Sequence, residues 1–334
     1  MPRKRLYSVI LGSVIGIGLL IGWFHYIDPA ELLAQIKQVR INYVVWAALF
    51  YLSAYFLRSA RWNIILRNQC RVSLYRSWLY SMGGNFVNYM IPIRLGEVVK
   101  AWFVKRNHGI GMIKVLPSIF IDKSFDTIAI FFILIMIPFI GVKISAPMTV
   151  LLLLLGLVFI VSLGIILFAA RRKSGVVNLL QKLFSWLPER IRLKLNQYIE
   201  LFIQGLNIFE HHWLNLAAAV MLTALGVLLD GLYFYMIFKA FDVSYPFVLV
   251  LFGYTLINLS YALPQPPAQL GSNEWMMIII FSIGFGLTAA DASVIMAFAH
   301  ILTALLMSGI GLFAIGLSGH QIVKAVFKGD KIYE

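Results

Sequence analysis

Polar residues with the chemistry of anion binding and ion coupling are concentrated in one short stretch, SMGGNFVNYMIPIRLGEVVK. Arg94 offers a planar guanidinium that binds phosphate oxygens bidentately, and Lys100 adds a second cation close by. Glu97 can pair with either cation, or it can bind a proton or a sodium ion. Asn85 and Asn88 add neutral amide groups. The stretch predicts a binding site for an anionic group; an interface anchor at Arg94 and a structural ion pair at Glu97 are the alternatives.

A second polar stretch, PQPPAQLGSNE, separates the apolar run of residues 247–263 from apolar residues that resume at Trp275. Like Glu97, Glu274 is either a residue of a binding site or a member of a structural ion pair, and Asn273 can orient it. Both stretches also contain residues that break helices, because proline lacks an N–H group and glycine has no side chain to restrain it. The helix-break candidates are Pro92, Gly96, Pro264 and Gly271.

Broken backbone at membrane depth persists only where protein or a water-filled cavity satisfies its polar groups. The ends of half-helices leave N–H and C=O groups free to bind ions or head groups. The sequence therefore predicts two re-entrant or broken helical hairpins, at residues 77–97 and 247–286. The charge distribution makes them enter from opposite sides, an arrangement typical of transporters with inverted repeats. Ordinary spans kinked by glycine and proline are the alternative.

Further ionisable residues lie at the ends of apolar segments or inside them. The candidates for binding an anionic substrate are Arg61 and Lys123, and those for gating or ion coupling are Asp122, Asp126 and Asp230. Asp122 and Asp126 share one helical face, although pairing with the helix dipole also explains them. Asp230 interrupts an apolar span, where packing against a polar partner is the alternative. His300 has no second ligand at metal spacing, so no metal site is predicted.

The composition shows which class of protein must position these residues. Of 334 residues, 61% are hydrophobic and 13% are charged, with a mean hydropathy of +0.86; soluble domains are about half apolar and a quarter charged. This excludes a water-soluble enzyme, a disordered chain and a secreted disulfide scaffold, and the last also fails because Cys70 is the single cysteine. The net charge of +14 lies in short tracts between apolar runs, as in membrane proteins, and predicts no nucleic-acid partner.

The apolar runs predict an all-α polytopic integral membrane protein with a single membrane domain over residues 1–334. About six full spans are expected, at residues 6–27, 43–57 (with a helical continuation to residue 65), 117–140, 148–170, 213–238 and 292–317. The two repeat-like halves cover residues 1–140 and 206–320. A short interfacial helix is expected at residues 28–40, and cytoplasmic amphipathic surface helices at residues 171–205. Nearly all lysines and arginines, and both termini, then lie on the cytoplasmic side.

The first polar stretch resembles a known signature. Asn85, followed after six residues by Pro92-Ile93-Arg94-Leu95-Gly96-Glu97, is similar to the N-x(6)-P-x-R-x-G-E motif of the flippase-like membrane family related to the transmembrane part of lysylphosphatidylglycerol synthases. Lys100 stands where that pattern usually has arginine. The segment Asp122-Lys123-Ser124-Phe125-Asp126 is similar to the family's E-R-x-x-D element, with its first two residues conservatively changed.

A third element of the family, P-x-G-G-x-G-x-x-E, is matched in part by the segment from Pro264 through Gly271 to Glu274. Ala268 and Gln269 stand where a glycine pair is expected, which bears directly on the backbone conformation of this loop. The resemblance covers most of the chain.

The resemblance implies a polytopic protein that moves or handles lipids, with an anionic phospholipid or a lipid-linked carrier as its partner. Relatives in which a soluble aminoacyl-transferase domain follows the membrane part make a lysyl-lipid and flip it. This chain reaches Glu334 without such a domain, so translocation rather than synthesis is expected, with a separate synthase as a candidate partner. The expected location is a prokaryotic cytoplasmic membrane.

The predicted function is a lipid flippase or transporter that moves an anionic head group through a polar cavity near the membrane midplane. A membrane enzyme or accessory subunit acting on a lipid-linked substrate is one alternative, and a scaffold with basic cytoplasmic faces is another. The sequence contains no P-loop, HExxH or GxSxG motif, so neither ATP hydrolysis nor a cofactor is expected. The identity of the lipid and the oligomeric state are left open.

Overall fold

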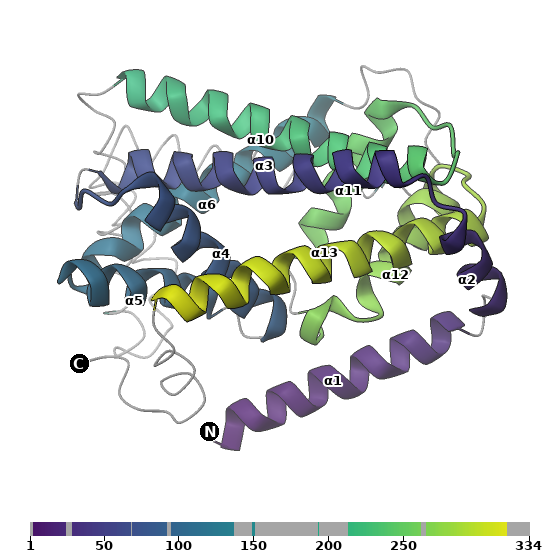
Figure 1. The fold of residues 1–334 in the computed structure, drawn as a ribbon, viewed down its shortest axis with the longest axis horizontal. Coiled ribbons are helices and arrows are strands. Elements are labelled where there is room, and N and C mark those ends of the chain that lie inside the picture. Colours follow the sequence, from purple (N-terminus) through teal and green to yellow (C-terminus); the bar gives the residue numbers. More distant parts are fainter. Residues whose placement is uncertain are drawn as a thin grey trace.

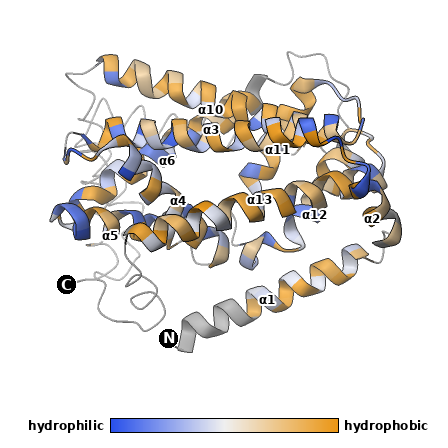
Figure 2. Cartoon of the chain, in the orientation of Figure 1, coloured by the Kyte–Doolittle hydropathy of each residue, from blue (hydrophilic) through white to orange (hydrophobic). Residues whose placement is uncertain are grey.

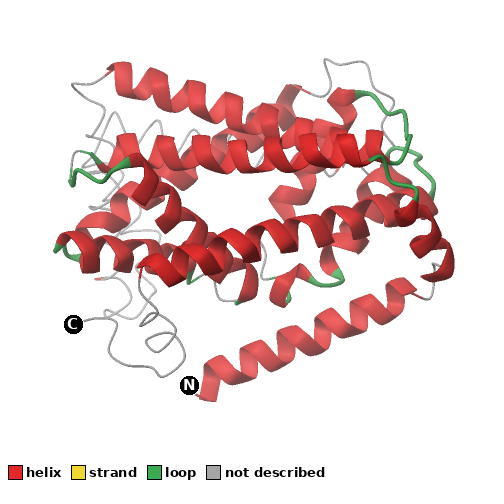
Figure 3. Cartoon of the chain, in the orientation of Figure 1, coloured by secondary structure: helices red, strands yellow, loops and turns green. Residues whose placement is uncertain are grey.

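The computed structural model describes residues 3–24, 29–67, 69–91, 95–136, 149–150, 193, 213–261 and 265–318, and every regular element in these ranges is a helix (Figure 3). In these ranges, the helices long and apolar enough to cross a bilayer are α3 (Ile41–Leu66), α10 (Trp213–Ala240) and the Ala289–Leu317 part of α13 (Ala289–Ser318). An α-helix rises about 1.5 Å per residue, so each of them exceeds the hydrocarbon thickness of about 30 Å.

Two further apolar segments are shorter, Leu11–Phe24 at the end of α1 (Arg3–Phe24) and α11 (Phe247–Ser260). The short helix α2 (Pro29–Lys37) follows α1 within the range where a short helix is predicted, residues 28–40; its position at the membrane interface stays a prediction. Large apolar side chains are exposed on the bundle, among them Trp213 (72% exposed) and Leu305 (68% exposed). Figure 2 shows that the long helices are mostly hydrophobic along their length. Such a surface is unfavourable in water and suits contact with lipid chains.

The span prediction is met in part. The predicted span at residues 117–140 corresponds to α6 (Met112–Met136), which begins earlier and contains Pro117 inside the helix. Helix α6 begins three residues after Gly109, a left-handed residue (φ 70°) that caps the preceding helix, α5 (Gly96–His108). The span expected at residues 148–170 and the surface helices expected at 171–205 lie outside the described residues, apart from single positions.

The first predicted hairpin is formed by two helices, α4 (Leu74–Met90) and α5 (Gly96–His108), separated by a short break. Ser73 caps α4, because its side chain accepts a hydrogen bond from the Arg76 N–H group. The basic stretch after Glu97 forms α5, whose last turn contains Lys105, Arg106 and His108. Pro92 and Arg94 lie outside the described residues.

The second predicted hairpin is also interrupted. After α11 the chain forms a short turn, η3 (Pro267–Gln269), and then resumes as α12 (Ser272–Met277) and the π-helical η4 (Ile278–Gly284). Pro264 lies outside the described residues. In Figure 1 the α4–α5 pair reaches the middle of the molecule from one end of its long axis, and the α11–α12 pair reaches it from the other.

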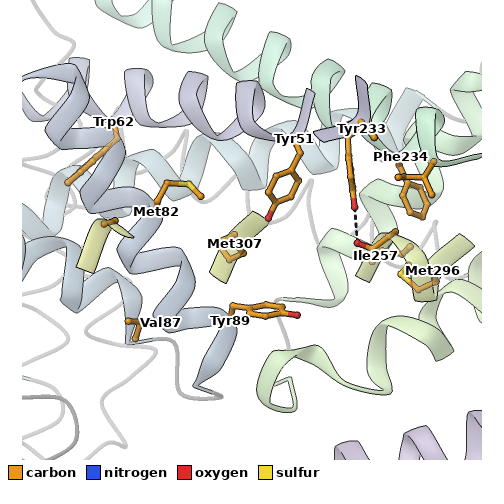
Figure 4. Packing of buried hydrophobic residues seen from close by; sticks show 14 of the residues in the cluster. Tyr51, Trp62, Met82, Val87, Tyr89, Tyr233, Phe234, Ile257, Met296 and Met307 are labelled. Carbon is orange, nitrogen blue, oxygen red and sulfur yellow. Dashed lines mark hydrogen bonds between the residues drawn. The ribbon is translucent and has the colours of Figure 1, made fainter. Parts of the chain in front are cut away.

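The buried core joins these broken segments to the long helices. Helix α3 packs against α10, and α13 packs against both α4 and α12. The core cluster contains aromatic and sulfur-containing side chains from these helices, among them Tyr51, Phe234 and Met307 (Figure 4). The two interrupted hairpins therefore meet inside a framework made by the long helices, and not at its surface.

Candidate functional site

A polar pocket of about 230 Å³ lies inside the bundle, among α3, α4, α10, α11, the α11–α12 loop and α13. Its walls include phenol groups, from Tyr51, Tyr55, Tyr89, Tyr233, Tyr254 and Tyr261. They also include side-chain amides, from Asn85, Asn88, Asn258, Gln265, Gln269 and Asn273. Figure 4 shows Tyr51, Tyr89 and Tyr233 on α3, α4 and α10 respectively. These neutral groups donate and accept hydrogen bonds, so they can hold a polar ligand without adding net charge.

Ionisable side chains also reach the pocket, namely Glu97 of α5, Lys123 of α6 and His300 of α13. The Glu97 carboxylate accepts hydrogen bonds from Nδ2 of Asn88, at 3.0 Å and 3.1 Å. Oδ1 of Asn88 accepts a third bond, 2.6 Å long, from the Gly96 N–H group. Asn88 therefore bridges the break between α4 and α5 and satisfies a free N–H group at the start of α5.

The α4–α5 hairpin depends on a very close approach of backbones at Gly96. A Cβ atom at this position would lie 2.0 Å from the Gly84 carbonyl oxygen and 2.6 Å from Cγ of Asn88. No real side chain tolerates such distances, so residue 96 must be glycine for this packing to exist. The helix-break role predicted for Gly96 thus acquires a second physical reason, the contact between the two helices.

His300 links three separate parts of the chain at the edge of the pocket. Its Nδ1 lies 2.6 Å from Oε1 of Glu274 in α12. Its Nε2 lies 2.7 Å from the carbonyl oxygen of Ala268 and 3.1 Å from the hydroxyl of Tyr89. All of these side chains are buried. Glu274 is therefore held by a histidine, whereas the sequence suggested that Asn273 orients it.

Asn273 has a different role in the structure. Its Nδ2 donates to Oε1 of Gln269 at 3.1 Å, so it fixes the loop next to the pocket that it lines. Its Oδ1 and Oε2 of Glu274 are buried and have no hydrogen-bond partner among the described residues. Buried polar atoms of this kind are rare because they cost free energy, and in a ligand pocket they are available to a bound group.

The loop between α11 and α12 has the left-handed backbone that its glycine-rich family counterpart suggests. Ala268 and Gln269, which replace the expected glycine pair, have φ values of 53° and 59°, and Gly271 has a φ of 77°. Left-handed conformations cost about 1–2 kcal/mol for residues with a side chain. Ala268 and Gln269 therefore add strain to a loop that contacts His300.

Helix α1 closes over this loop. A Cβ atom on Gly271 would lie 2.5 Å from Cβ of Leu19 and 2.8 Å from the carbonyl oxygen of Gly16. The indole N–H group of Trp275 also donates to the Leu19 carbonyl oxygen at 2.9 Å. Gly271 thus serves both as a left-handed residue and as a point of close contact with α1.

The other charged candidates form a separate buried network beside the pocket. Arg61 is fully buried and donates to Asp122 at 2.7 Å, to Asp126 at 2.8 Å and to the Thr223 hydroxyl at 2.9 Å. The network joins α3, α6 and α10. The two aspartates lie on one face of α6, as their spacing predicts.

Arg58 extends this network. It forms a bidentate pair with Asp230 and lies 3.5 Å from Asp126. Asp230 thus has the polar partner that a carboxylate inside an apolar helix requires. Lys123 lies 3.9 Å from Asp126 at the edge of the network and reaches the pocket.

Lys100 is buried on α5, and its Nζ lies 5.1 Å from the centroid of the Trp62 ring. It does not belong to the residues that line the pocket. The structure therefore collects Asn85, Asn88, Glu97, Lys123 and Asn273 around one cavity. Arg61, Asp122, Asp126 and Asp230 lie in the neighbouring network. Lys100 lies against the Trp62 ring. Glu274 contacts the cavity through His300.

Sequence reasoning did not find the partners of His300 or the tyrosine lining. A lone histidine inside an apolar segment was considered only as a metal ligand. Within the ranges that the structure describes, no cluster of His, Cys, Asp and Glu has a metal-binding arrangement. The sequence signal that could have paired them is that His300 and Glu274 both lie in or beside apolar segments. A buried ionisable side chain needs a polar partner, and each of these two residues could supply one for the other.

The fold and the pocket define a helical membrane protein with a polar cavity between interrupted helices. The family model for the lysylphosphatidylglycerol synthase TM region matches residues 9–311. The chain belongs to this family, which confirms the resemblance drawn from its motifs.

Two archaeal relatives share this similarity. A UPF0104 membrane protein of Methanocaldococcus jannaschii is 24% identical over 199 residues, covering 59% of this chain and 80% of the relative. A UPF0104 membrane protein of Methanothermobacter thermautotrophicus is 23% identical over 305 residues, covering 84% of each chain. No solved structure matches the chain. These relatives fit a protein of a prokaryotic cytoplasmic membrane.

Proposed function

We propose that the protein is a lipid flippase, in which the polar head group of an anionic lipid enters the pocket while its apolar tails stay in the bilayer. The observation that carries this proposal is the cavity of about 230 Å³ lined by phenols and amides inside a bundle with an apolar exterior. A head group loses its hydration on entering the membrane, and hydrogen bonds from such a lining replace that water. Membership of the lysylphosphatidylglycerol synthase TM family supports a lipid-related substrate.

The proposal includes a topology. The α4–α5 and α11–α12 pairs are two re-entrant hairpins of opposed orientation, and their breaks meet near the membrane midplane. Their opposite directions along the molecule support this assignment (Figure 1), as do the contacts of α4 with η3. Both termini are cytoplasmic in this topology, and the pocket is reached alternately from the two leaflets.

The residues have distinct roles in this proposal. Asn85, Asn88 and Asn273 donate hydrogen bonds to the head group, and Lys123 supplies positive charge from the pocket wall. Arg94, which precedes α5 in the sequence, is proposed as a further phosphate ligand because its guanidinium binds phosphate oxygens bidentately. Lys100 and Arg61 contribute positive potential at longer range. The aspartates of the Arg58–Arg61 network, with Glu97 and Glu274, are proposed to control gating or ion coupling.

Reconstitution of the protein into phosphatidylcholine vesicles tests the proposal. The vesicles contain fluorescent phosphatidylglycerol, and a membrane-impermeant quencher reports which leaflet holds the label. Vesicles with protein should exchange the label faster than empty vesicles. Exchange no faster than in empty vesicles contradicts the proposal. Mass spectrometry of the same lipids separates the alternatives, because a lipid-modifying enzyme changes the mass of the head group and a flippase does not.

A matched pair of variants in the α4–α5 hairpin locates the activity. Asn88→Ala removes two hydrogen bonds to Glu97 and one to Gly96, so exchange should fall about tenfold. Asn107→Ala removes an amide from the exposed end of α5, away from the pocket, where Nδ2 donates to the Phe103 carbonyl oxygen of its own helix. That control should exchange lipid at the wild-type rate. Equal rates in both variants would place the pathway elsewhere.

The prediction of a separate synthase that supplies the lipid stays a prediction. It would be tested by co-purification of the tagged chain from its own membranes, with lipid-modifying activity measured in the eluate.

A further inference from the structure

The distances from the two ring nitrogens of His300 to their partners indicate how many protons the His300–Glu274 pair holds. Nε2 lies 2.7 Å from the Ala268 carbonyl oxygen, and a carbonyl oxygen only accepts, so Nε2 carries a hydrogen. Nδ1 lies 2.6 Å from Oε1 of Glu274, a distance at which two lone pairs would repel unless a hydrogen lies between them. The pair therefore holds one more proton than a neutral histidine beside a carboxylate would, and its net charge is zero.

Because the pair is buried, loss of this proton would be costly in free energy. His300 is 7% exposed and Glu274 is 4% exposed, and Oε2 of Glu274 has no partner among the described residues. Loss of the shared proton would leave a net negative charge in this place, at a cost of several kcal/mol. The conformation described is therefore the proton-loaded one. Release of the proton from this conformation is therefore unfavourable unless the surroundings of the pair change.

Other titratable groups face the same pocket from every element packed around it. They are Tyr51, Tyr55, Tyr89, Tyr233, Tyr254, Tyr261, Glu97 and Lys123. Among them, only Tyr89 has a hydrogen bond to His300 in the described part of the chain. Glu97 is held by Asn88, and Lys123 lies next to Asp126. Phenols ionise at far higher pH than imidazole, so the His300–Glu274 pair is the group at this wall whose geometry already holds an exchangeable proton.

We propose that the His300–Glu274 pair is a proton-binding site that makes the binding of an anionic head group depend on proton uptake. This inference rests on the proposed function of the pocket. His300 lines the pocket directly. The proton-loaded pair is neutral and admits an anion, whereas the deprotonated pair adds a negative charge to the wall and repels it. In this proposal the His300–Glu274 pair binds the proton, and the pocket beside it binds the head group of an anionic lipid.

The charges balance in this scheme. The pair takes a proton from water on one side of the membrane, and the head group binds while the pair is neutral. Both are released on the other side, and no bond in the lipid forms or breaks. The proton cancels the negative charge of the head group, so coupled transport moves no net charge.

Vesicles of phosphatidylcholine with fluorescent phosphatidylglycerol and an internal pH-sensitive dye test the coupling. With wild-type protein, exchange of phosphatidylglycerol should fall about tenfold for each pH unit above the point where the pair releases its proton. Movement of the anionic lipid should be accompanied by proton movement in the same direction. An imposed membrane potential should have little effect on the rate.

Glu274→Gln provides the decisive variant, because the glutamine amide can still donate to Nδ1 of His300 while the titratable proton is lost. This variant should move phosphatidylglycerol without protons, lose the pH dependence and become sensitive to membrane potential. His300→Gln, whose amide can donate to the Ala268 carbonyl oxygen, should also move no protons. The matched control is Asp242→Asn, at an exposed residue with a φ of 58° that asparagine tolerates. It should retain wild-type coupling.

The outcomes are distinguishable. If wild-type protein exchanges the lipid without proton movement and at a rate independent of pH, the coupling is wrong while the flippase proposal stands. Full proton movement in Glu274→Gln also refutes the assignment of the site. If wild-type protein exchanges no lipid, both proposals fail. The wild-type measurement decides the question even if a variant does not fold.

Discussion

Replacing Arg61 with methionine tests whether the buried charge network fastens three helices together. Methionine has a similar length and fills the same space with apolar atoms. The substitution removes bonds of 2.7 Å to Asp122, 2.8 Å to Asp126 and 2.9 Å to Thr223. Helices α3, α6 and α10 lose their shared polar contact, and the aspartates lose a cation.

The expected loss in the free energy of unfolding depends on which carboxylate is left without a cation. Asp126 keeps Arg58 at 3.5 Å and Lys123 at 3.9 Å, so part of its negative charge stays compensated. Asp122 has a side chain only 4% exposed, and Arg61 is its one ion-pair partner among the described residues. Removing one member of a buried pair costs about 3–5 kcal/mol, and that is the expected loss in the free energy of unfolding.

Reversible unfolding in mixed detergent micelles, followed by circular dichroism, measures this loss. Arg71→Met, at an exposed arginine, is the matched control and should change stability by less than about 0.5 kcal/mol. Adding Asp122→Asn to Arg61→Met removes the stranded charge and should restore about 1–3 kcal/mol. A loss below about 1 kcal/mol in Arg61→Met, or no recovery in the double variant, would refute the reasoning.

Three further changes have specific expected results. Gly96→Ala should force α4 and α5 apart, because its Cβ would lie 2.0 Å from the Gly84 carbonyl oxygen. The variant should therefore lower both the thermal midpoint and the rate of lipid exchange. The control Gly309→Ala should change neither, since a Cβ there has no atom within 4 Å. Ala268→Gly should raise the free energy of unfolding by about 1 kcal/mol by relieving the left-handed strain at a φ of 53°; an unchanged midpoint in urea or detergent titration would contradict this. Asp230→Asn should cost about 1.5–3 kcal/mol in the same unfolding assay, since it replaces the bidentate partner of Arg58, and a neutral effect would contradict the pairing.

The membrane class and the places where helices break could be predicted from local sequence alone. Runs of apolar residues select a bilayer, and glycine and proline limit helices within a few residues of their own positions. The break between α4 and α5 follows the glycine and proline pattern around Gly96, and the family motif there was recognised from consecutive residues. The amides at Asn85 and Asn88 were found in the same way, because they lie on one short stretch.

The partners of these residues could not be predicted, since they are far apart in the chain. Tyr89 contacts His300 across 211 residues, and Arg58 contacts Asp230 across 172 residues. Each residue has many partners compatible with its chemistry, and only the packing of α3, α4, α10 and α13 selects among them. Lys100 shows the same effect, because its sequence context suggested an anion ligand and its helix turns it toward Trp62.

By itself, the sequence determined that this chain is a helical membrane protein of a lipid-related family, with polar residues clustered at two helix breaks. Those properties depend on solvent preference and local backbone freedom, which neighbouring residues set. The tertiary structure alone decided that amides and phenols from separate helices form one pocket, and that Glu274 lies within hydrogen-bond distance of His300. Charge compensation and cavity formation depend on distances between helices, and these distances are a property of the packed bundle.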